Sequence, residues 1–370
     1  MTRNRRLAAS TAPPFLSVLI AMGTACTPGL DASVGEESAP IVNGTAVPRG
    51  SMAAQGVVAL PGCTGTLITN RHVLTARHCA GTWLGGSNGY SSTPRAPFTI
   101  RLEGTTASSD QNVVSSRVFE PNTSTLNAGD YAVVELSSPM AIGGSTDNFY
   151  NPIYQRPDSD LRGRTVSCAG YGWNRLATPV ASGGGGGTLR SANLLVGDTG
   201  SGWMNLSRNS AGQIGAPGDS GSTCFVDGQV VGVQSTCDRN GWFDLNGDGQ
   251  FQQNEWSSIT LCTAAAPSAH RGFVEGLVLA DVDVDFTFAP AQSGTVAVVL
   301  ETPRDSEEVP LTGGSGALSD FAPRSGWIEA RVEPEPPNTL CSTIRSRTPL
   351  DGSVSLRGSC LNEGLLPVLL

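Results

Sequence analysis

Ser220 stands in a segment that can carry nucleophilic chemistry, Gly218-Asp219-Ser220-Gly221-Ser222. Glycines on both sides of the serine permit a tight backbone turn, because glycine adopts conformations that other residues avoid. Such a turn exposes the hydroxyl group and directs neighbouring N–H groups toward one point. The segment therefore makes Ser220 a candidate nucleophile for acyl transfer, provided that a base lies beside it.

The base in such a reaction is a neutral imidazole, and a carboxylate orients it. The chain contains three histidines, at positions 72, 78 and 270. His78 lies in the segment LTARHC, residues 74–79, directly before a cysteine, whereas we expect His72 at the surface beside a turn. Asp130 opens an apolar run, residues 130–136, that predicts a strand. His78 and Asp130 are therefore the candidate base and orienting carboxylate for Ser220.

Four segments resemble the signatures of the chymotrypsin/trypsin family of serine proteases. In chain order they are residues 41–44 (IVNG), 75–79 (TARHC), 130–133 (DYAV) and 218–221 (GDSG). The last segment alone is a modest signal, but four in the family's order and at similar separations are specific. The resemblance covers about residues 41–245. It implies an all-β fold of two Greek-key, six-stranded β-barrels.

The resemblance also implies a role for each matching residue. Ser220 is expected to be the nucleophile, His78 the general base and then acid, and Asp130 the orienting carboxylate. The backbone N–H groups of Gly218 and Ser220 are expected to form the oxyanion hole. The substrates implied are proteins or peptides, and the chemistry requires no cofactor. A catalytically inactive homologue that serves as an extracellular binding protein remains the alternative.

The resemblance further implies an activation step. After a cut before Ile41, its new α-ammonium group is expected to pair with Asp219. Pro40 precedes the cut, where trypsin-like zymogens usually carry Arg or Lys, so another protease or later trimming is implied. Ser222 replaces the second glycine that usually follows the nucleophile.

A pocket for the side chain before the scissile bond is implied as well. The residues that the resemblance places there are Ile214, Ser235, Thr236 and Cys237. Ile214 stands at the floor and offers no carboxylate for a cationic side chain, and Cys237 replaces a usual glycine. These two residues predict a preference for small apolar side chains. Ala216 replaces a family cysteine, however, so a different loop path that admits Asp227 or Asp238 stays open.

Residues 244–255 match the twelve-residue calcium-loop pattern, with oxygen donors at five positions, a backbone carbonyl at position 7 and a glycine at position 6. The residues concerned are Asp244, Asn246, Asp248, Gln250, Gln252 and Glu255, of which Gln250 at position 7 would contribute its backbone carbonyl. No convincing helix precedes the segment, so we expect an isolated loop that binds a structural calcium ion. A solvated turn is the alternative. Either the segment is an insertion in the barrel, or this end of the fold differs from that of the family.

The chain has nine cysteines, and setting Cys26 aside leaves an even number, which predicts four disulfides in an exported protein. The eight are Cys63, Cys79, Cys168, Cys224, Cys237, Cys262, Cys341 and Cys360. The family resemblance implies the pairs Cys63–Cys79 and Cys168–Cys224. Cys237 and Cys262 bracket the calcium-type segment. None of the cysteines shows the spacing of a zinc site.

The N-terminal region predicts export. Residues 1–25 combine a basic start with a short apolar stretch, as in a signal peptide, and residues 26–40 are typical of a linker or pro-segment. Cys26 after Gly23-Thr24-Ala25 resembles a bacterial lipoprotein cleavage box, which would place the protein in the cell envelope, for instance as an outer-membrane lipoprotein. An aliphatic residue is expected in place of Gly23, so lipidation and simple cleavage both stay open.

Short apolar runs separated by Gly, Pro, Asn and Ser predict strands over residues 41–280, which we assign to the protease domain. Residues 286–370 are predicted to form a small separate β-module, and an alternative makes this module the ligand-binding part of the protein. Asp281, Asp283 and Asp285 alternate with apolar residues, which predicts a solvated strand face. The net charge of −9 argues against nucleic acid or an acidic membrane surface as a partner.

Overall fold

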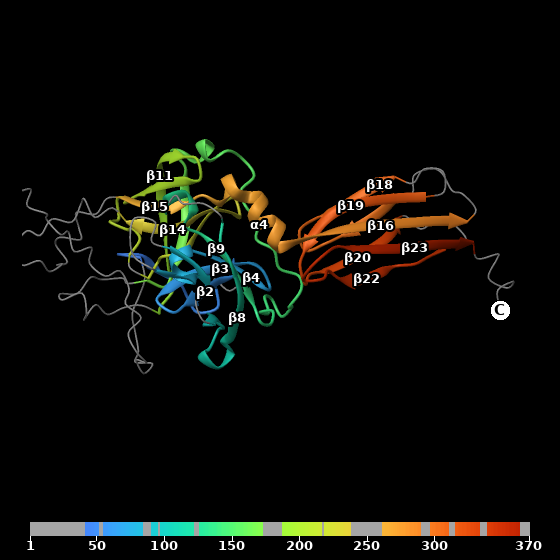
Figure 1. Ribbon diagram of the computed structural model, residues 1–370, viewed down its shortest axis with the longest axis horizontal. Coiled ribbons are helices and arrows are strands. Elements are labelled where there is room, and N and C mark those ends of the chain that lie inside the picture. The colour runs from blue at the N-terminus through green and yellow to red at the C-terminus, as the bar shows by residue number, and fades with distance from the viewer. Residues whose placement is uncertain are drawn as a thin grey trace, which may run out of the picture. The chain divides into compact units, whose positions relative to one another are not determined.

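The structure is a computed structural model that describes residues 41–51, 55–83, 90–94, 97–121, 126–172, 187–216, 218–237, 261–289, 297–310, 315–333 and 339–362. Residues 1–40 and the calcium-type segment 244–255 lie outside this part of the chain. Two β-barrels and a β-module follow one another along the sequence (Figure 1). None of the helices in the described ranges is both long and apolar enough to cross a membrane.

The first barrel is a closed antiparallel sheet with the strand order β2-β3-β4-β9-β8-β7. Its strands are β2 (Val57–Leu60), β3 (Cys63–Thr69), β4 (His72–Thr75), β7 (Thr99–Leu102), β8 (Gln111–Phe119) and β9 (Ala132–Leu136). β-Branched and leucine side chains fill its interior, among them Val58, Leu67, Ile100 and Val134. Such residues favour strands because they pack well on a pleated, half-buried surface.

The second barrel has the strand order β11-β10-β13-β14-β15-β12, and pairing of β12 with β11 closes it. Its strands are β10 (Thr165–Gly170), β11 (Arg190–Gly200), β12 (Trp203–Ser207), β13 (Thr223–Val226), β14 (Gln229–Cys237) and β15 (Leu261–Ala265), and β1 (Thr45–Ala46) pairs with the outer side of β11. Strand β15 pairs with both β14 and β12. Strands β14 and β15, which precede and follow residues 238–260 in the sequence, are therefore paired directly with each other. The predicted all-β fold with two six-stranded barrels is confirmed.

One apolar cluster joins the two barrels. Ile68 and Leu74 of the first barrel belong to the same buried cluster as Val233 and Ala265 of the second. The catalytic candidates come from both barrels. This shared core therefore fixes the positions of the candidates in the first barrel relative to those in the second. His72 is buried in β4, contrary to the surface position we expected, and its Nδ1 bonds to the hydroxyl of Thr69 at 2.8 Å.

Short elements connect the strands. They are α1 (Arg77–Ala80), β5 (Gly81–Trp83), β6 (Tyr90–Pro94), α2 (Leu126–Gly129) and α4 (Arg271–Val278), with 3₁₀ turns at Ala107–Ser109, Asp158–Leu161 and Pro267–His270. Helix α4 buries Val274 and Val278 in the cluster that joins the barrels. Helix α1 carries His78, the candidate base.

The C-terminal module consists of two four-stranded sheets, β19-β16-β23-β21 and β18-β17-β20-β22. Its strands are β16 (Leu279–Ala289), β17 (Ala297–Glu301), β18 (Ser306–Pro310), β19 (Ser315–Pro323), β20 (Trp327–Glu333), β21 (Thr339–Cys341), β22 (Ile344–Arg347) and β23 (Val354–Asn362). In β16, Val282 and Val284 are buried while Asp281, Asp283 and Asp285 are exposed. The first strand of the module thus begins at Leu279, before the boundary at residue 286 that the composition suggested.

Candidate active site

Helix α1 holds His78 at the end of strand β4, and a disulfide between Cys63 and Cys79 ties the helix to the start of β3. The His78 ring is a quarter exposed, and its Nδ1 lies 2.8 Å from Oδ2 of Asp130. The backbone N–H of His78 donates to Oδ1 of the same carboxylate at 3.0 Å. Two bonds to one carboxylate therefore fix both the helix turn and the plane of the imidazole.

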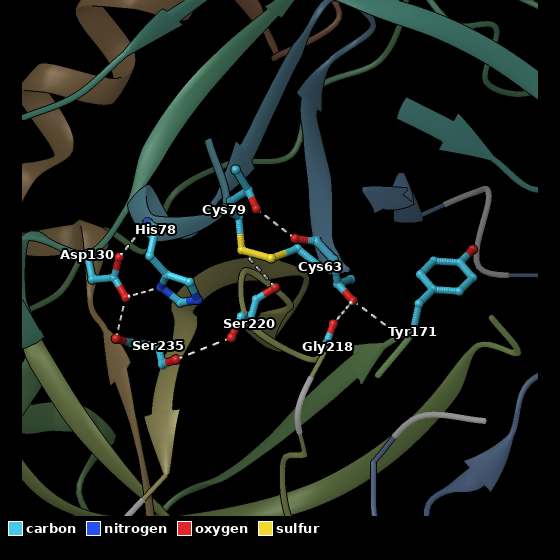
Figure 2. The surroundings of a disulfide bond; sticks show 10 residues. Cys63, His78, Cys79, Asp130, Tyr171, Gly218, Ser220 and Ser235 are labelled. Carbon is cyan, nitrogen blue, oxygen red and sulfur yellow. Dashed lines mark hydrogen bonds and ion pairs between the residues drawn. A yellow bond between two sulfur atoms is a disulfide. The ribbon is translucent and has the colours of Figure 1, made fainter. Parts of the chain in front are cut away.

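Asp130 is fully buried just before strand β9, and its carboxylate accepts a further bond from the hydroxyl of Ser235 in β14. Burial acts to raise the pKa of Asp130, but the charge of His78 and the hydrogen bonds from His78 and Ser235 outweigh it, so the pKa is lowered. Asp130 therefore stays ionised at neutral pH. Figure 2 shows Asp130 between His78 and Ser235.

The ionised carboxylate determines the state of the imidazole. Burial acts to lower the pKa of His78, but the charge of Asp130 and its hydrogen bond raise it above the ordinary value of 6.5. Because Asp130 only accepts, Nδ1 carries a proton, and Nε2 of the neutral ring is left as a proton acceptor. The pair is thus arranged to accept a proton at Nε2.

Ser220 lies in a turn between two glycines with positive φ angles, +92° at Gly218 and +82° at Gly221. A Cβ atom at Gly221 would lie 2.2 Å from both the carbonyl oxygen of Thr64 and the hydroxyl oxygen of Thr75. The close approach of strands β3 and β4 thus requires glycine here. In the described part of the chain, neither the Gly218 nor the Ser220 N–H has a hydrogen-bond acceptor.

The hydroxyl of Ser220 lies 3.5 Å from the carbonyl oxygen of Ser235 and makes no hydrogen bond to His78 among the described residues. Figure 2 shows the His78 ring between Asp130 and Ser220 in that view. Bonds between a nucleophile and its base are often long without substrate and shorten in the complex. The structure thus brings the predicted triad into one site with the Asp–His bond formed.

Asp219, directly before Ser220 in the sequence, is buried. Its Oδ2 accepts the backbone N–H groups of Ile41 at 3.0 Å and Ala216 at 2.8 Å, and its Oδ1 accepts that of Gly172 at 2.9 Å. Burial raises the pKa of Asp219 to about 7, although these three bonds act to lower it. The predicted pair of Ile41 and Asp219 is therefore in contact.

The residues predicted for the specificity pocket lie in two segments that flank Ser220. Ile214 is buried, and its carbonyl accepts the N–H of Val42 at 3.0 Å. Thr236 is exposed in β14, next to Ser235. Cys237 forms a disulfide with Cys262, which faces it across β14 and β15.

The disulfide sulfurs lie 3.5 Å and 3.8 Å from the carbonyl oxygen of Gly215, so they pack against the segment that leads to the nucleophile. The side chain of Asp227 is 71% exposed and pairs with Arg164, which removes it as a pocket carboxylate. Asp238 lies outside the described residues.

Among the described residues there are four disulfides: Cys63–Cys79, Cys168–Cys224, Cys237–Cys262 and Cys341–Cys360. The first two are the pairs that the family resemblance implied. Four disulfides are typical of exported proteins, because reducing compartments keep thiols reduced.

Two contributions to the site were missed in the sequence. Ser235 was assigned to the pocket, not to the Asp130 carboxylate, and Thr64 was not singled out at all. Ser235 and Asp130 are 105 positions apart, and Thr64 and Gly218 are 154 apart. Only the packing of the two barrels against each other brings these pairs together, and no local sequence pattern indicates that they are in contact.

Comparison with protein-family models gives a match to the family described as trypsin over residues 41–242, more than half of the chain. A comparison with curated proteins gave no match. The matched segment contains the first barrel, the second barrel as far as strand β14, and His78, Asp130 and Ser220, whereas strand β15 lies beyond it. The chain belongs to the trypsin family of serine proteases.

Proposed function

We propose that the protein is an exported serine endopeptidase that cleaves peptide bonds through Ser220, His78 and Asp130. The bond between His78 and the ionised Asp130 is the observation that carries this proposal, because it leaves Nε2 as a base on the ring. Family membership supports peptide hydrolysis in general.

In the proposed reaction, the Ser220 hydroxyl attacks the scissile carbonyl carbon while Nε2 of His78 takes its proton. The N–H groups of Gly218 and Ser220 stabilise the resulting oxyanion. His78 then donates its proton to the leaving amine, which gives an acyl-enzyme. Water, deprotonated by His78, attacks the ester carbonyl and releases the acid and free Ser220. No step requires a cofactor.

A fluorophosphonate probe, which phosphonylates an activated serine, tests this proposal. We expect the protein that begins at Ile41 to be labelled and its Ser220→Ala variant to remain unlabelled. Ser222→Ala is the matched control, since Ser222 is buried two residues later and its hydroxyl has no partner within the described structure. Unlabelled wild-type protein would instead support an inactive homologue that binds extracellular ligands.

A cut before Ile41 is part of the proposal. Ile41 has a φ angle of +52°, which is rare for a β-branched residue and therefore strained. Cleavage removes the preceding carbonyl group and with it this restraint, while the new ammonium group can pair with Asp219. N-terminal sequencing of the active enzyme identifies its first residue, and a start upstream of Ile41 contradicts the proposal.

For specificity, we expect small apolar side chains such as Ala or Val before the scissile bond. A buried Ile214 gives a cationic side chain no partner, and an unpaired buried charge costs several kcal/mol. The Cys237–Cys262 disulfide occupies space where the family usually has glycine. Comparing kcat/KM for matched peptides ending in Ala, Val, Phe or Arg tests the expectation. A preference for Arg contradicts it.

We also propose that residues 244–255 bind a structural calcium ion. A metal bound only by the folded state raises the free energy of unfolding, here by about 1 to 3 kcal/mol at 10 mM calcium if the dissociation constant is in the range of extracellular sites, about 10⁻⁴ to 10⁻³ M. Melting curves with EDTA and with calcium measure the shift. The Asp244→Ala variant should show none, and identical curves for the wild-type protein contradict the site.

Export through residues 1–25 completes the proposal, and it agrees with the four disulfides. Lipidation at Cys26 and simple cleavage nearby predict different N-terminal masses. Mass spectrometry of the protein purified from its own cells distinguishes them, because a diacylglyceryl group on Cys26 adds several hundred daltons.

A further inference from the structure

The inference concerns Thr64 in strand β3 and rests on the proposed function. Thr64 is fully buried beneath the nucleophile turn. Its backbone N–H donates to the carbonyl of Ser220 at 2.9 Å, and its side-chain hydroxyl donates to the carbonyl of Gly218 at 3.0 Å. One residue thus holds the carbonyl groups on both sides of Asp219.

The direction of the Thr64 hydroxyl bond is fixed by its surroundings. The backbone N–H of Tyr171 donates to the Thr64 oxygen at 2.8 Å, and an N–H group can only donate. The carbonyl of Gly218 can only accept, so the Thr64 hydroxyl proton points to it. Both bonds are drawn in Figure 2, beside the labels of Gly218 and Tyr171.

Thr64 is itself held in place. Its carbonyl oxygen accepts the hydroxyl of Thr75 at 2.7 Å, and Thr75 ends the strand that leads to His78. The hydrogen bonds therefore link the strand before the base to the turn that carries the nucleophile. A Cβ atom at Gly221 would collide with this link, as described above.

The carbonyl groups that Thr64 holds belong to the peptide planes on either side of the plane that carries the Ser220 N–H. Fixing the two outer planes restricts rotation of the inner one. Misplacing a group that contacts the reacting atoms by about 1 Å can cost about 100-fold in rate. We propose that the Thr64 hydroxyl is a positioning group that holds the Ser220 N–H in the direction needed to stabilise the oxyanion.

Thr64→Val removes the hydroxyl and keeps the shape of the side chain. We expect kcat to fall about 10- to 100-fold while KM changes little, because the ground-state contacts of the substrate are untouched. Affinity for a peptide boronic acid, which forms a tetrahedral adduct on Ser220, should fall by a similar factor. Thr64→Ser, which restores the hydroxyl, should recover most of both.

Thr66→Val is the matched control. Thr66 lies two residues along the same strand, is fully buried, and bonds to the hydroxyl of Thr223 away from the peptide planes in question. We expect it to lower the melting temperature but to leave kcat and boronate affinity near wild type.

If Thr64→Val keeps wild-type kcat and boronate affinity, or loses no more than Thr66→Val at equal stability, the positioning role is wrong. Failure of the Ser220 proposal itself gives a different result, since the wild-type protein would then not react with fluorophosphonate. If Thr64→Val does not fold, Thr64→Ala and Thr64→Ser are compared instead, and equal kcat in these two variants overturns the role.

Discussion

Replacing Ser220 by alanine should lower kcat by about 10⁴- to 10⁶-fold and leave the fold unchanged. The hydroxyl is the attacking group in the proposed mechanism, and among the described residues it makes no structural bond shorter than its 3.5 Å contact with the Ser235 carbonyl. Steady-state kinetics on a peptide substrate, with circular dichroism and thermal melts for the variant, measure both parts. Retained activity in purified Ser220→Ala protein would exclude this serine as the nucleophile.

His78→Ala should produce a loss of similar size, and the double variant should lose little more, because the serine and the imidazole act as a unit. His270→Ala is the control. That ring packs 5.5 Å from the ring of Tyr131, so its removal should affect stability and not the chemical step. If His270→Ala and His78→Ala lose equal activity, the role of His78 as the base is not supported.

A cut before Ile41 should change how stability depends on pH. In the uncut chain, the folded-state pKa of Asp219 is about 7, whereas its ordinary value is 3.8. Between these values the folded state holds a proton that the unfolded state has released, so the free energy of unfolding falls as pH rises. The total loss from this group is about 4 kcal/mol, complete above pH 7. In the cut form, the ammonium group of Ile41 favours the ionised carboxylate and reduces the loss.

Urea denaturation of the uncut and cut forms at pH 4 and pH 7 measures this difference. The Asp219→Asn variant should remove it, since no carboxyl group remains to titrate. The same variant, in the cut form, should lose activity by about 100- to 1,000-fold, the size of effect seen when an oxyanion-hole donor is removed. Equal pH dependence in the cut and uncut wild-type forms would mean that Asp219 does not pair with the new N-terminus.

The parts of the site that lie close together in sequence could be predicted from it. The turn around Ser220 depends on glycines beside it, and the strand after Asp130 depends on its own apolar run. The partners of these residues could not be predicted in the same way, because Ser235 reaches Asp130 only through closure of the second barrel against the first. His72 was misplaced for a related reason, since its bond to Thr69 and its burial in β4 depend on packing.

The start of the C-terminal module is a second feature that could not be predicted from the sequence. Helix α4 has eight residues, which is too short to show a sustained helical period, and β16 begins at the next position, Leu279. No linker of distinct composition separates the two elements. The alternation of Asp and Val in residues 281–285 predicted the exposed face correctly but did not indicate to which sheet the strand belongs.

The Cys237–Cys262 disulfide affects how far the sequence of the enclosed segment can change in this family member. It joins two facing residues of adjacent barrel strands, so the two ends of the chain segment between them are covalently linked to each other at the barrel. The entropy of closing that loop is fixed by the cross-link in the unfolded chain as well as in the folded one. Changes in the length or composition of the enclosed segment therefore have little effect on the stability of the barrel. Such a segment can acquire a ligand-binding sequence, as we propose for residues 244–255, while the catalytic scaffold stays the same.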